Sequence, residues 1–390
     1  MSDSTPDLGV GMVGYAFMGA AHSQAWRTAP AFFDLPLTPR LAAICGRDAT
    51  AAAQVARRFG WESVETDWRS LLTRDDIHLI DVCTPGDTHA EIAIAALEAG
   101  KHVLCEKPLA NTVEEAEAMA AAAAEAARHG VRAMVGFTYR RVPAVSYARQ
   151  LVASGRLGTI RHVRGQYLQD WLADEDVPLS WRLDKATAGS GALGDIGAHI
   201  IDMAQFVTGA SLTTVSGLME TFVDSRPIAG EHATLGGTGG GGERGPVTVD
   251  DATAFTGRFD NGALGVFEAT RFATGRKNAI RLEVNGSDGS IAFDFEDMNV
   301  LEYYDATQPA VEAGFRRIIV TEADHPYVAG WWPPGHGLGY EHGFTHQVVD
   351  LVTDIAKGAD PTPSFADGLA VQRVLAAVEA SAASGTTERI

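Results

Sequence analysis

Two acidic residues and a histidine recur at helical spacing in the stretch that follows residue 191. His199 lies four residues after Asp195, and Asp202 lies three residues further on, so a helix would present all three on one face. A carboxylate beside an imidazole orients the ring and sets its proton affinity, which is how a general base for neutral pH is built. The alternative is a helix with an acidic first turn and one histidine in the core.

A lysine is the second candidate for chemistry. Lys107 lies between Glu106 and Pro108, and a residue before proline adopts extended backbone, which fixes the direction of its side chain. Its ammonium group can donate a hydrogen bond to a reacting hydroxyl and stabilise negative charge that develops there. The alternative is a surface pair of Glu106 and Lys107 without a chemical role.

A glycine-rich turn lies near the N-terminus. Gly14, Ala16 and Gly19 follow an apolar run in the pattern G-x-G-x-x-G, with alanine at the second glycine position. In a strand–turn–helix unit, such a turn lets the backbone approach the pyrophosphate of a dinucleotide. The sequence therefore predicts that this turn binds NAD or NADP.

The end of the next apolar run bears on the choice between the two dinucleotides. Gly46 stands where an acid would accept hydrogen bonds from the ribose of NAD, and Arg47 follows it. A guanidinium suits a 2′-phosphate, so the sequence favours NADP slightly over NAD. Because Asp48 is close by, use of NAD stays open.

The elements that must position these residues change character along the chain. Up to residue 132, apolar runs at 8–13, 41–45, 77–83, 103–105 and 131–137 are separated by helix-like stretches at 49–59, 88–99 and 113–129. Strands that are apolar throughout and separated by helices are typical of a parallel sheet covered on both faces. We expect an α/β fold with a doubly wound Rossmann domain over residues 1–132.

Residues 133–390 follow a different pattern. Turn signals at 260–262 and 286–289 join neighbouring runs rich in Val, Thr and Phe, which predicts hairpins at 253–271 and 280–295. Helical patterns at 143–153, 195–207 and 343–357 accompany them, so we expect an α+β domain with an antiparallel sheet. The glycine-rich stretch 235–245 is interpreted as a surface loop.

Composition excludes several classes of function. The net charge of −19 would repel a phosphate backbone, so we expect no nucleic-acid partner. No long apolar run and no signal-peptide pattern is present, which predicts a cytoplasmic protein without a membrane role. The three cysteines lack metal-ligand spacing, and His342 and His346 lack a third ligand, so we expect no metal.

Three further stretches carry a resemblance to a known family. These are Cys83-Thr84-Pro85 with His89 after it, Glu106-Lys107-Pro108, and the run Gly191–His199. In this order, the chain resembles the glucose–fructose oxidoreductase/inositol dehydrogenase (Gfo/Idh/MocA) family over nearly its whole length. The resemblance implies a C-terminal domain with a large open sheet that binds substrate and forms a homo-oligomer, a dimer or a tetramer. It also implies NAD(P)-dependent oxidation of a secondary hydroxyl.

The resemblance also assigns residues to roles. It implies that Lys107, Asp195 and His199 are catalytic. The residues expected to bind the cofactor are Gly14, Ala16, Phe17, Met18, Gly19, Gly46, Arg47, Thr84, Pro85, His89 and Glu106. The residues expected to contact the substrate are Tyr139, Gln169, Asp170, Trp171, Arg182 and Asp202.

The expected substrate is a neutral sugar, an anhydrosugar or a cyclic polyol. The stretches 167–171, 181–182 and 331–334 are similar to members of the family that oxidise such compounds, and no arginine pair is placed to hold a phosphate. Two alternatives stay open. One is a redox-neutral lyase or glycosidase in which bound NAD oxidises the sugar transiently, and the other is a cofactor-binding sensor without catalysis.

Overall fold

The computed structural model describes residues 5–228 and 242–390, so most of the predicted loop at 235–245 lies outside the described residues. Within them the chain forms two compact units. The first extends to Arg141 and includes Gly330–Trp332 and Leu338–Ala370. The second comprises Val142–Ala329, Pro333–Gly337 and Val371–Ile390. The sequence pattern predicts one domain boundary, near residue 132. In the structure, the chain also returns to the first unit for Leu338–Ala370.

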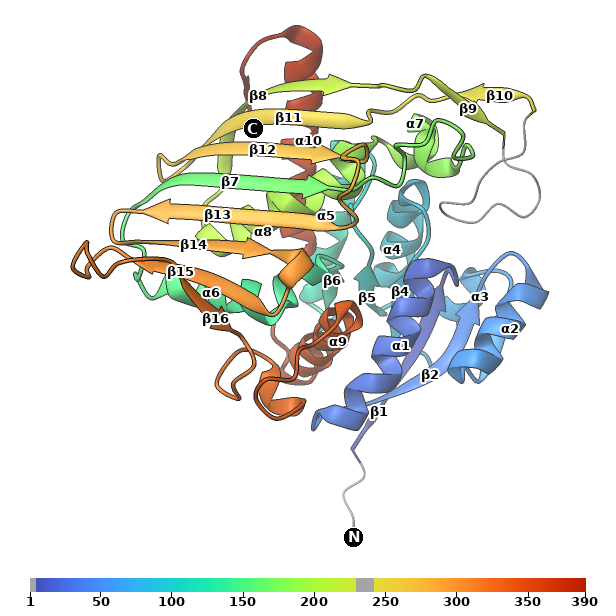
Figure 1. The fold of residues 1–390 in the computed structure, drawn as a ribbon. Coiled ribbons are helices and arrows are strands. Elements are labelled where there is room, and N and C mark those ends of the chain that lie inside the picture. Colours follow the sequence, from blue (N-terminus) through green and yellow to red (C-terminus); the bar gives the residue numbers. More distant parts are fainter. Residues whose placement is uncertain (1–4, 229–241) are drawn as a thin grey trace. The chain divides into compact units, whose positions relative to one another are not determined.

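The first unit is built on a six-stranded parallel sheet of strand order β3-β2-β1-β4-β5-β6 (Figure 1). Its strands are β1 (Asp7–Val13), β2 (Thr38–Cys45), β3 (Ser63–Glu65), β4 (Leu79–Val82), β5 (His102–Cys105) and β6 (Ala133–Val135). Its helices are α1 (Phe17–Phe32), α2 (Ala49–Phe59), α3 (Arg69–Leu72), α4 (His89–Glu98), α5 (Val113–Ala127) and α9 (Tyr340–Lys357). The predicted Rossmann topology is confirmed.

Helix α9 completes the core of this unit. It packs against α1, and its Phe344, Val348 and Leu351 are buried in the same apolar cluster as Met12 of β1 and Trp26 of α1. These side chains recur at intervals of three and four residues, so one stripe of the amphipathic helix is apolar. The first sheet therefore depends on a helix that follows it by about two hundred residues in the chain.

The second unit is built on a nine-stranded sheet of strand order β16-β15-β14-β13-β7-β12-β11-β8-β17 (Figure 1). Its strands are β7 (Ile160–Leu168), β8 (Leu212–Glu220), β11 (Ala252–Phe259), β12 (Leu264–Thr270), β13 (Ala279–Gly286), β14 (Gly289–Asp294), β15 (Val300–Asp305), β16 (Arg316–Ile319) and β17 (Glu388–Arg389). All neighbours pair antiparallel except β7 and β12, so the predicted, mainly antiparallel sheet is confirmed. A small ladder joins β9 (Ser225–Pro227) to β10 (Arg244–Pro246).

Helices cover one face of this sheet. They include α6 (Pro143–Ala153) and α8 (Ala198–Thr208). The short helix α7 (Lys185–Ala188) precedes α8 in the chain. Helix α10 (Phe365–Ser384) belongs to the first unit up to Ala370 and to the second unit from Val371. Gly165 of β7 lets α8 approach, because a Cβ there would lie 2.6 Å from Ile200. Along β11, buried and exposed residues alternate, as expected for a sheet with one covered face and one open face.

Short turns of helix carry several of the predicted site residues. These turns are η1 (Gly86–Thr88), η2 (Thr138–Arg141), η3 (Trp181–Leu183), the π-helical turn η4 (Leu193–Gly197), η5 (Phe295–Asp297) and η6 (Val328–Gly330). Among the helices the structure describes, none combines the length and the apolar character needed to cross a membrane.

Candidate active site

The glycine turn after β1 has the geometry that a dinucleotide requires. Gly14 has a φ of +100°, and its N–H donates to the carbonyl oxygen of Cys45 over 2.9 Å. A Cβ at Gly14 would lie 2.6 Å from the Cys83 carbonyl oxygen, and one at Gly19 would lie 2.2 Å from the Gly14 carbonyl oxygen. Only glycine fits at either position, which brings α1 close to the end of the strand.

The N-terminus of α1 is suited to an anion. Ala16 precedes the helix and has no side chain that caps its first turn, and that turn contains no acidic residue. Phe17 opens the helix with 59% of its surface exposed, followed by Met18. Backbone N–H groups and the helix dipole there favour a pyrophosphate, so these residues fit a dinucleotide.

The residues after β2 are arranged differently from a typical ribose site. A Cβ at Gly46 would lie 2.0 Å from the Tyr15 ring, so the ring occupies the space of a side chain. The Asp48 carboxylate caps α2, accepting from the N–H groups of Thr50 and Ala51 at 2.8 and 3.1 Å. Arg47 is exposed and is left as the side chain free to face a ribose or its phosphate.

The loops after β4 and β5 are tied together by a histidine. The ring nitrogens of His89 lie 2.9 Å from the Thr84 carbonyl oxygen, just before Pro85, and 3.0 Å from that of Pro108. Both nitrogens of His89 are thus used within the protein. The loops of Thr84 and Lys107 are thereby held side by side at the carboxyl edge of the sheet, where open α/β sheets bind ligands.

Glu106 faces inward from the end of β5, and Lys107 follows it. The Glu106 carboxylate is 4% exposed, and its Oε2 accepts the N–H of Lys107 at 3.2 Å. The carboxylate therefore fixes the backbone at Lys107, while the Lys107 side chain remains partly exposed. A buried Glu106 that is bonded to the backbone of Lys107 agrees better with a functional site than with an exposed ion pair between the two side chains.

Tyr139 and Arg140 lie in η2 after β6, and both are 8% exposed. Arg140 donates to Asp367 Oδ1 at 3.2 Å. Burial raises the pKa of Asp367, but the Arg140 charge and the hydrogen bonds from Ser364 and Arg140 together outweigh it, so the pKa lies below its usual value. Arg140 is therefore held by a carboxylate of its own unit.

In the second unit, Asp195 lies in the π-helical turn before α8. Asp250 fixes this turn: its carboxylate accepts the N–H groups of Gly191 and Leu193 at 2.6 and 2.8 Å. A Cβ at Gly191 would lie 1.8 Å from the Asp250 carbonyl oxygen, so the motif needs its glycine. π-Helical turns are frequent at functional sites, because they displace one side chain from the regular helical position.

A buried arginine lies beside Asp195. Nη1 of Arg271 is 3.8 Å from Asp195 Oδ2, its Nη2 donates to the Asp250 carbonyl oxygen at 3.0 Å, and its side chain has no exposed surface. The Arg271 guanidinium also lies 5.6 Å from the ring centroid of Trp171. The Asp195 side chain is 30% exposed, so it lies between the buried Arg271 guanidinium and the solvent.

His199 lies beside a hydrogen-bonded network that contains the predicted Gln169. The rings of His199 and Tyr167 are 6.0 Å apart. Tyr167 and Gln169 both donate to Asn278 Oδ1, at 2.8 and 2.7 Å, and Trp171 donates to Gln169 at 3.0 Å. The structure therefore connects the strand end that carries these residues with the helix that carries His199.

Three other predicted residues have separate surroundings. Asp170 accepts from Lys277 at 2.7 Å and from the N–H of Gly275 at 3.0 Å. Burial lowers the pKa of Arg182, although the Asp195 charge opposes the shift, and its guanidinium lies 4.4 Å from the Trp181 ring. Asp202 of α8 is 2% exposed.

Sequence reasoning missed Asp250 and Arg271. Both residues lie more than fifty positions after Asp195 in the chain, so neither forms a sequence motif with it. A signal was present in the Asp250-Asp251 doublet at a strand start, where Asp251 Oδ2 accepts the N–H groups of Phe222 and Val223. Such buried carboxylates fix backbone turns.

Trp331 and His346 pack together within the first unit. Trp331 Nε1 donates to His346 Nε2 at 2.7 Å, and its ring packs on Phe32 and Phe33. Trp332 is 47% exposed. Among the described residues, the three metal-capable groups that lie close together are His22, Asp81 and Cys83, all buried.

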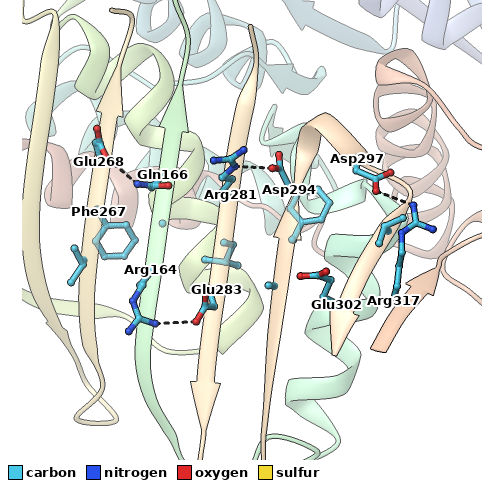
Figure 2. A pocket seen from close by; sticks show the side chains of 16 residues that line it. Arg164, Gln166, Phe267, Glu268, Arg281, Glu283, Asp294, Asp297, Glu302 and Arg317 are labelled. Carbon is cyan, nitrogen blue, oxygen red and sulfur yellow. Dashed lines mark hydrogen bonds and ion pairs between the residues drawn. The ribbon is translucent and has the colours of Figure 1, made fainter. Parts of the chain in front are cut away.

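A hollow of about 540 Å³ lies on the open face of the nine-stranded sheet (Figure 2). Its three arginines are each paired with an acid: Arg164 with Glu283 at 3.1 Å, Arg281 with Asp294 at 2.7 Å, and Arg317 with Asp297 at 3.0 Å. Glu268 and Glu302 also line the hollow, so its acidic side chains outnumber its basic ones. The ion pairs are spread along the face and do not converge on one point, as they would in a catalytic site.

Comparisons with known proteins agree with both units. Residues 8–137 match the family described as "Oxidoreductase family, NAD-binding Rossmann fold", and residues 145–292 match the "GFO/IDH/MocA C-terminal domain". The chain therefore belongs to the GFO/IDH/MocA family of oxidoreductases.

Individual relatives are similar over their full length. Levoglucosan dehydrogenase of Pseudarthrobacter phenanthrenivorans is 45% identical over 97% of this chain and 96% of its own. The crystal structure of an oxidoreductase domain protein from Kribbella flavida is 70% identical, with a TM-score of 0.95 and 99% of each chain covered. A levoglucosan dehydrogenase in complex with NADH and levoglucosan is 43% identical, with a TM-score of 0.92 and 98% and 99% of the two chains covered.

Proposed function

We propose that this enzyme oxidises a secondary hydroxyl of a neutral anhydrosugar of the levoglucosan type to a ketone, with NAD as the hydride acceptor. Pyranoses and cyclic polyols are the neighbouring substrates of the same class. The observation that carries the proposal is the full-length similarity to a dehydrogenase solved with NADH and levoglucosan. The built surroundings of Lys107 and Asp195 support it.

The reaction removes a proton from the hydroxyl oxygen and a hydride from its carbon. NAD, when bound, would supply the acceptor for the hydride. In the proposal, Lys107 donates a hydrogen bond to the substrate oxygen and stabilises negative charge that develops on it. His199 accepts the hydroxyl proton as general base, and Asp195 orients its ring. Arg271, which is buried with its Nη1 3.8 Å from Asp195 Oδ2, holds that carboxylate in place.

The substrate contacts are proposed from the second unit. Gln169, Trp171 and Arg182 provide one amide, one indole and one guanidinium, which suits a ring with several hydroxyls. Asp170 and Arg140 are already engaged by Lys277 and Asp367. A phosphate dianion would lack a pair of free guanidinium groups, so we place neutral sugars first.

NAD is proposed as the working cofactor. The relatives solved with a dinucleotide include complexes with NADH, which does not support the slight preference for NADP that the sequence indicated. Arg47 of this chain is exposed after β2, so we propose that NADP can also bind, with its 2′-phosphate in contact with Arg47.

We propose a homo-oligomer, a dimer or a tetramer, that works in the cytoplasm. The open sheet face carries exposed Leu218, Val266 and Ile319 together with arginines that are already paired, and such a face suits a second copy. The free, buried Cys45, Cys83 and Cys105 suit a reducing compartment. Light scattering of Leu218→Arg against the wild-type chain tests the assembly: a smaller mass supports this face, and an unchanged oligomer excludes it.

An activity screen tests the reaction itself. Levoglucosan, inositols, pyranoses and their phosphate esters are offered with NAD and with NADP, and reduction of the nicotinamide is followed. We expect kcat/KM for a neutral substrate to exceed that of every phosphate ester by at least about tenfold, or about 1.4 kcal/mol. Turnover without net reduction of the nicotinamide indicates a redox-neutral enzyme instead, and binding without turnover indicates a sensor.

A further inference from the structure

A buried hydrogen-bonded network lies beneath the carboxyl edge of the first sheet. His22 of α1 is 1% exposed and lies between two carboxylates. Its Nδ1 is 2.9 Å from Asp81 Oδ1, and its Nε2 is 3.0 Å from Glu106 Oε1. One imidazole therefore joins α1 to the ends of β4 and β5, and none of the chemistry proposed above has used it.

Both carboxylates have further partners. Asp81 Oδ2 accepts from Trp26 Nε1 at 2.7 Å, and Asp81 Oδ1 accepts from Cys83 Sγ at 3.4 Å. The other oxygen of Glu106 accepts the N–H of Lys107 at 3.2 Å. Each oxygen of the two carboxylates is thus bonded, so the network defines a single arrangement.

The backbone just after β6 also approaches the network. A Cβ at Gly136 would lie 2.7 Å from Glu106 Oε1. Glu106 is therefore held between the His22 ring and a glycine that can approach it. Movement of either neighbour would shift the carboxylate and, with it, the backbone of Lys107.

The geometry also defines the charge on His22. A neutral imidazole has one N–H, so one carboxylate would face a nitrogen lone pair, whereas an imidazolium donates to both. Burial is the strongest single effect and opposes the charge, but the charge and hydrogen bond of Asp81, together with the neighbouring Cys83, outweigh it, so the pKa of His22 lies well above its usual value. Burial raises the pKa of Cys83, so that thiol stays neutral. The ring of Phe344, which faces His22 from α9, adds no charge.

We propose that His22 is a positioning residue that, as an imidazolium bonded to Asp81 and Glu106, fixes Glu106 and thereby aims Lys107 at the reacting hydroxyl. This inference rests on the proposed role of Lys107. The charged state of His22 can nevertheless be tested separately from the role of Lys107, because it is a property of the protein without substrate or cofactor. A metal held by His22, Asp81 and Cys83 is the competing explanation, and it would bind the His22 ring as a neutral imidazole.

The first experiment reads the protonation state directly. Nitrogen-15 spectra of histidine-labelled protein, without added dinucleotide, are recorded between about pH 6 and 9. The His22 signals are identified by their loss in His22→Gln. We expect both ring nitrogens to keep their protons at about pH 8, well above the usual histidine pKa. A neutral ring at that pH, or stoichiometric zinc in the purified protein, overturns the proposal.

The second experiment reads the consequence for Lys107. We expect His22→Gln to lower kcat by about ten- to a hundredfold, while KM for the sugar and Kd for the dinucleotide change by less than about threefold. The matched control is His102→Gln, a substitution at the opposite end of β5, where His102 accepts the N–H of Arg132. It should keep kcat within about twofold. A His22→Gln enzyme with more than half of the wild-type kcat overturns the proposal.

A third variant serves if His22→Gln fails to fold. Asp81→Asn keeps the shape of the side chain but removes the charge beside His22, so His22 should titrate near neutral pH and kcat should acquire a matching dependence on pH. An Asp81→Asn enzyme whose kcat and His22 signals follow the wild-type profile overturns the proposal. Lys107→Ala in the same assays separates the proposed role of Lys107 from the proposed charge on His22. Full activity of Lys107→Ala refutes the role of Lys107. The His22 spectra test the charged network independently of that result.

Discussion

The ring of Tyr15 fills the space beside Gly46, where a Cβ would lie 2.0 Å from Tyr15 Cε1. In the sequence, Gly46 stands where an acid would accept hydrogen bonds from the ribose of NAD. The structure adds a steric reason, because no side chain at residue 46 fits while the ring stays in place. We therefore propose that Arg47, which is exposed, discriminates between the two dinucleotides.

Replacement of Arg47 tests this. We expect Arg47→Glu to weaken NADP binding by at least about tenfold, because it exchanges an attraction to the 2′-phosphate for a repulsion. NAD binding should change by less than about threefold. Calorimetry with both dinucleotides measures this, and Arg57→Glu, with the same charge change at the other end of α2, is the control. Equal effects of the two variants on NADP would show only a general electrostatic influence.

Lys107 is expected to act on kcat. Lys107→Ala should lower kcat by about two to three orders of magnitude, the scale of a lost oxyanion donor, with little change in dinucleotide Kd. Steady-state kinetics and calorimetry measure the two quantities. Lys357→Ala, which removes an exposed lysine from the last turn of α9, is the control. A Lys107→Ala enzyme with more than about a tenth of the wild-type kcat would return the residue to the surface-pair interpretation.

His199 is expected to govern the pH profile of oxidation. A general base must lose its own proton before it accepts one, so kcat/KM should rise with pH and then level off. His199→Gln should abolish the rise, whereas His325→Gln, elsewhere in the second unit, should keep it. The apparent pKa belongs to the cluster of interacting groups and to no one residue. A wild-type profile that is flat from about pH 5.5 to 9 would contradict the assignment.

His346 gives the first unit a sensitivity to acid. Burial lowers the pKa of His346 to about 3, and its Nε2 must stay unprotonated to accept from Trp331. The unfolded chain therefore binds more protons below about pH 6.5, and stability falls as the pH falls from there towards 3. The loss is at most about 1.4 kcal/mol per pH unit.

Thermal unfolding across this pH range tests the effect. We expect the Tm of His346→Gln to be lower than that of the wild-type protein at neutral pH, because a buried acceptor is altered, and the gap to narrow as the pH falls. His129→Gln replaces an exposed histidine of the same unit and should follow the wild-type curve. A gap that stays constant with pH would show that His346 does not titrate on unfolding.

Local patterns explain why much of the fold could be predicted. Most strands of the first sheet are apolar runs, although β3 (Ser63–Glu65) is not, and the φ of +100° at Gly14 is a local requirement for glycine. The hairpin at 260–262 was likewise predicted, and there Gly262 adopts a φ of +87°. Such features depend on neighbours in the chain, so the sequence expresses them directly.

The remaining features depend on distant partners. β7 lies between β12 and β13, strands that follow it by about a hundred residues, and no local signal specifies that insertion. Arg271 reaches Asp195 only because β12 ends beside the π-helical turn, and His22 lies near Glu106 only once α1 has packed on the sheet. These relationships arise from tertiary pairing, so spacing in the sequence does not reveal them.

The packing of α9 against α1 limits how this protein can be recombined. A gene fragment that ends at Arg141 would encode every strand of the first sheet but would leave Trp26 and its neighbours without Phe344, Val348 and Leu351. Such a fragment should aggregate when expressed alone. Exchange of cofactor domains between relatives, in the laboratory or by natural gene fusion, must therefore transfer residues 338–370 together with the N-terminal segment. The coding sequence is divided differently from the folded units, and a single crossover cannot separate them.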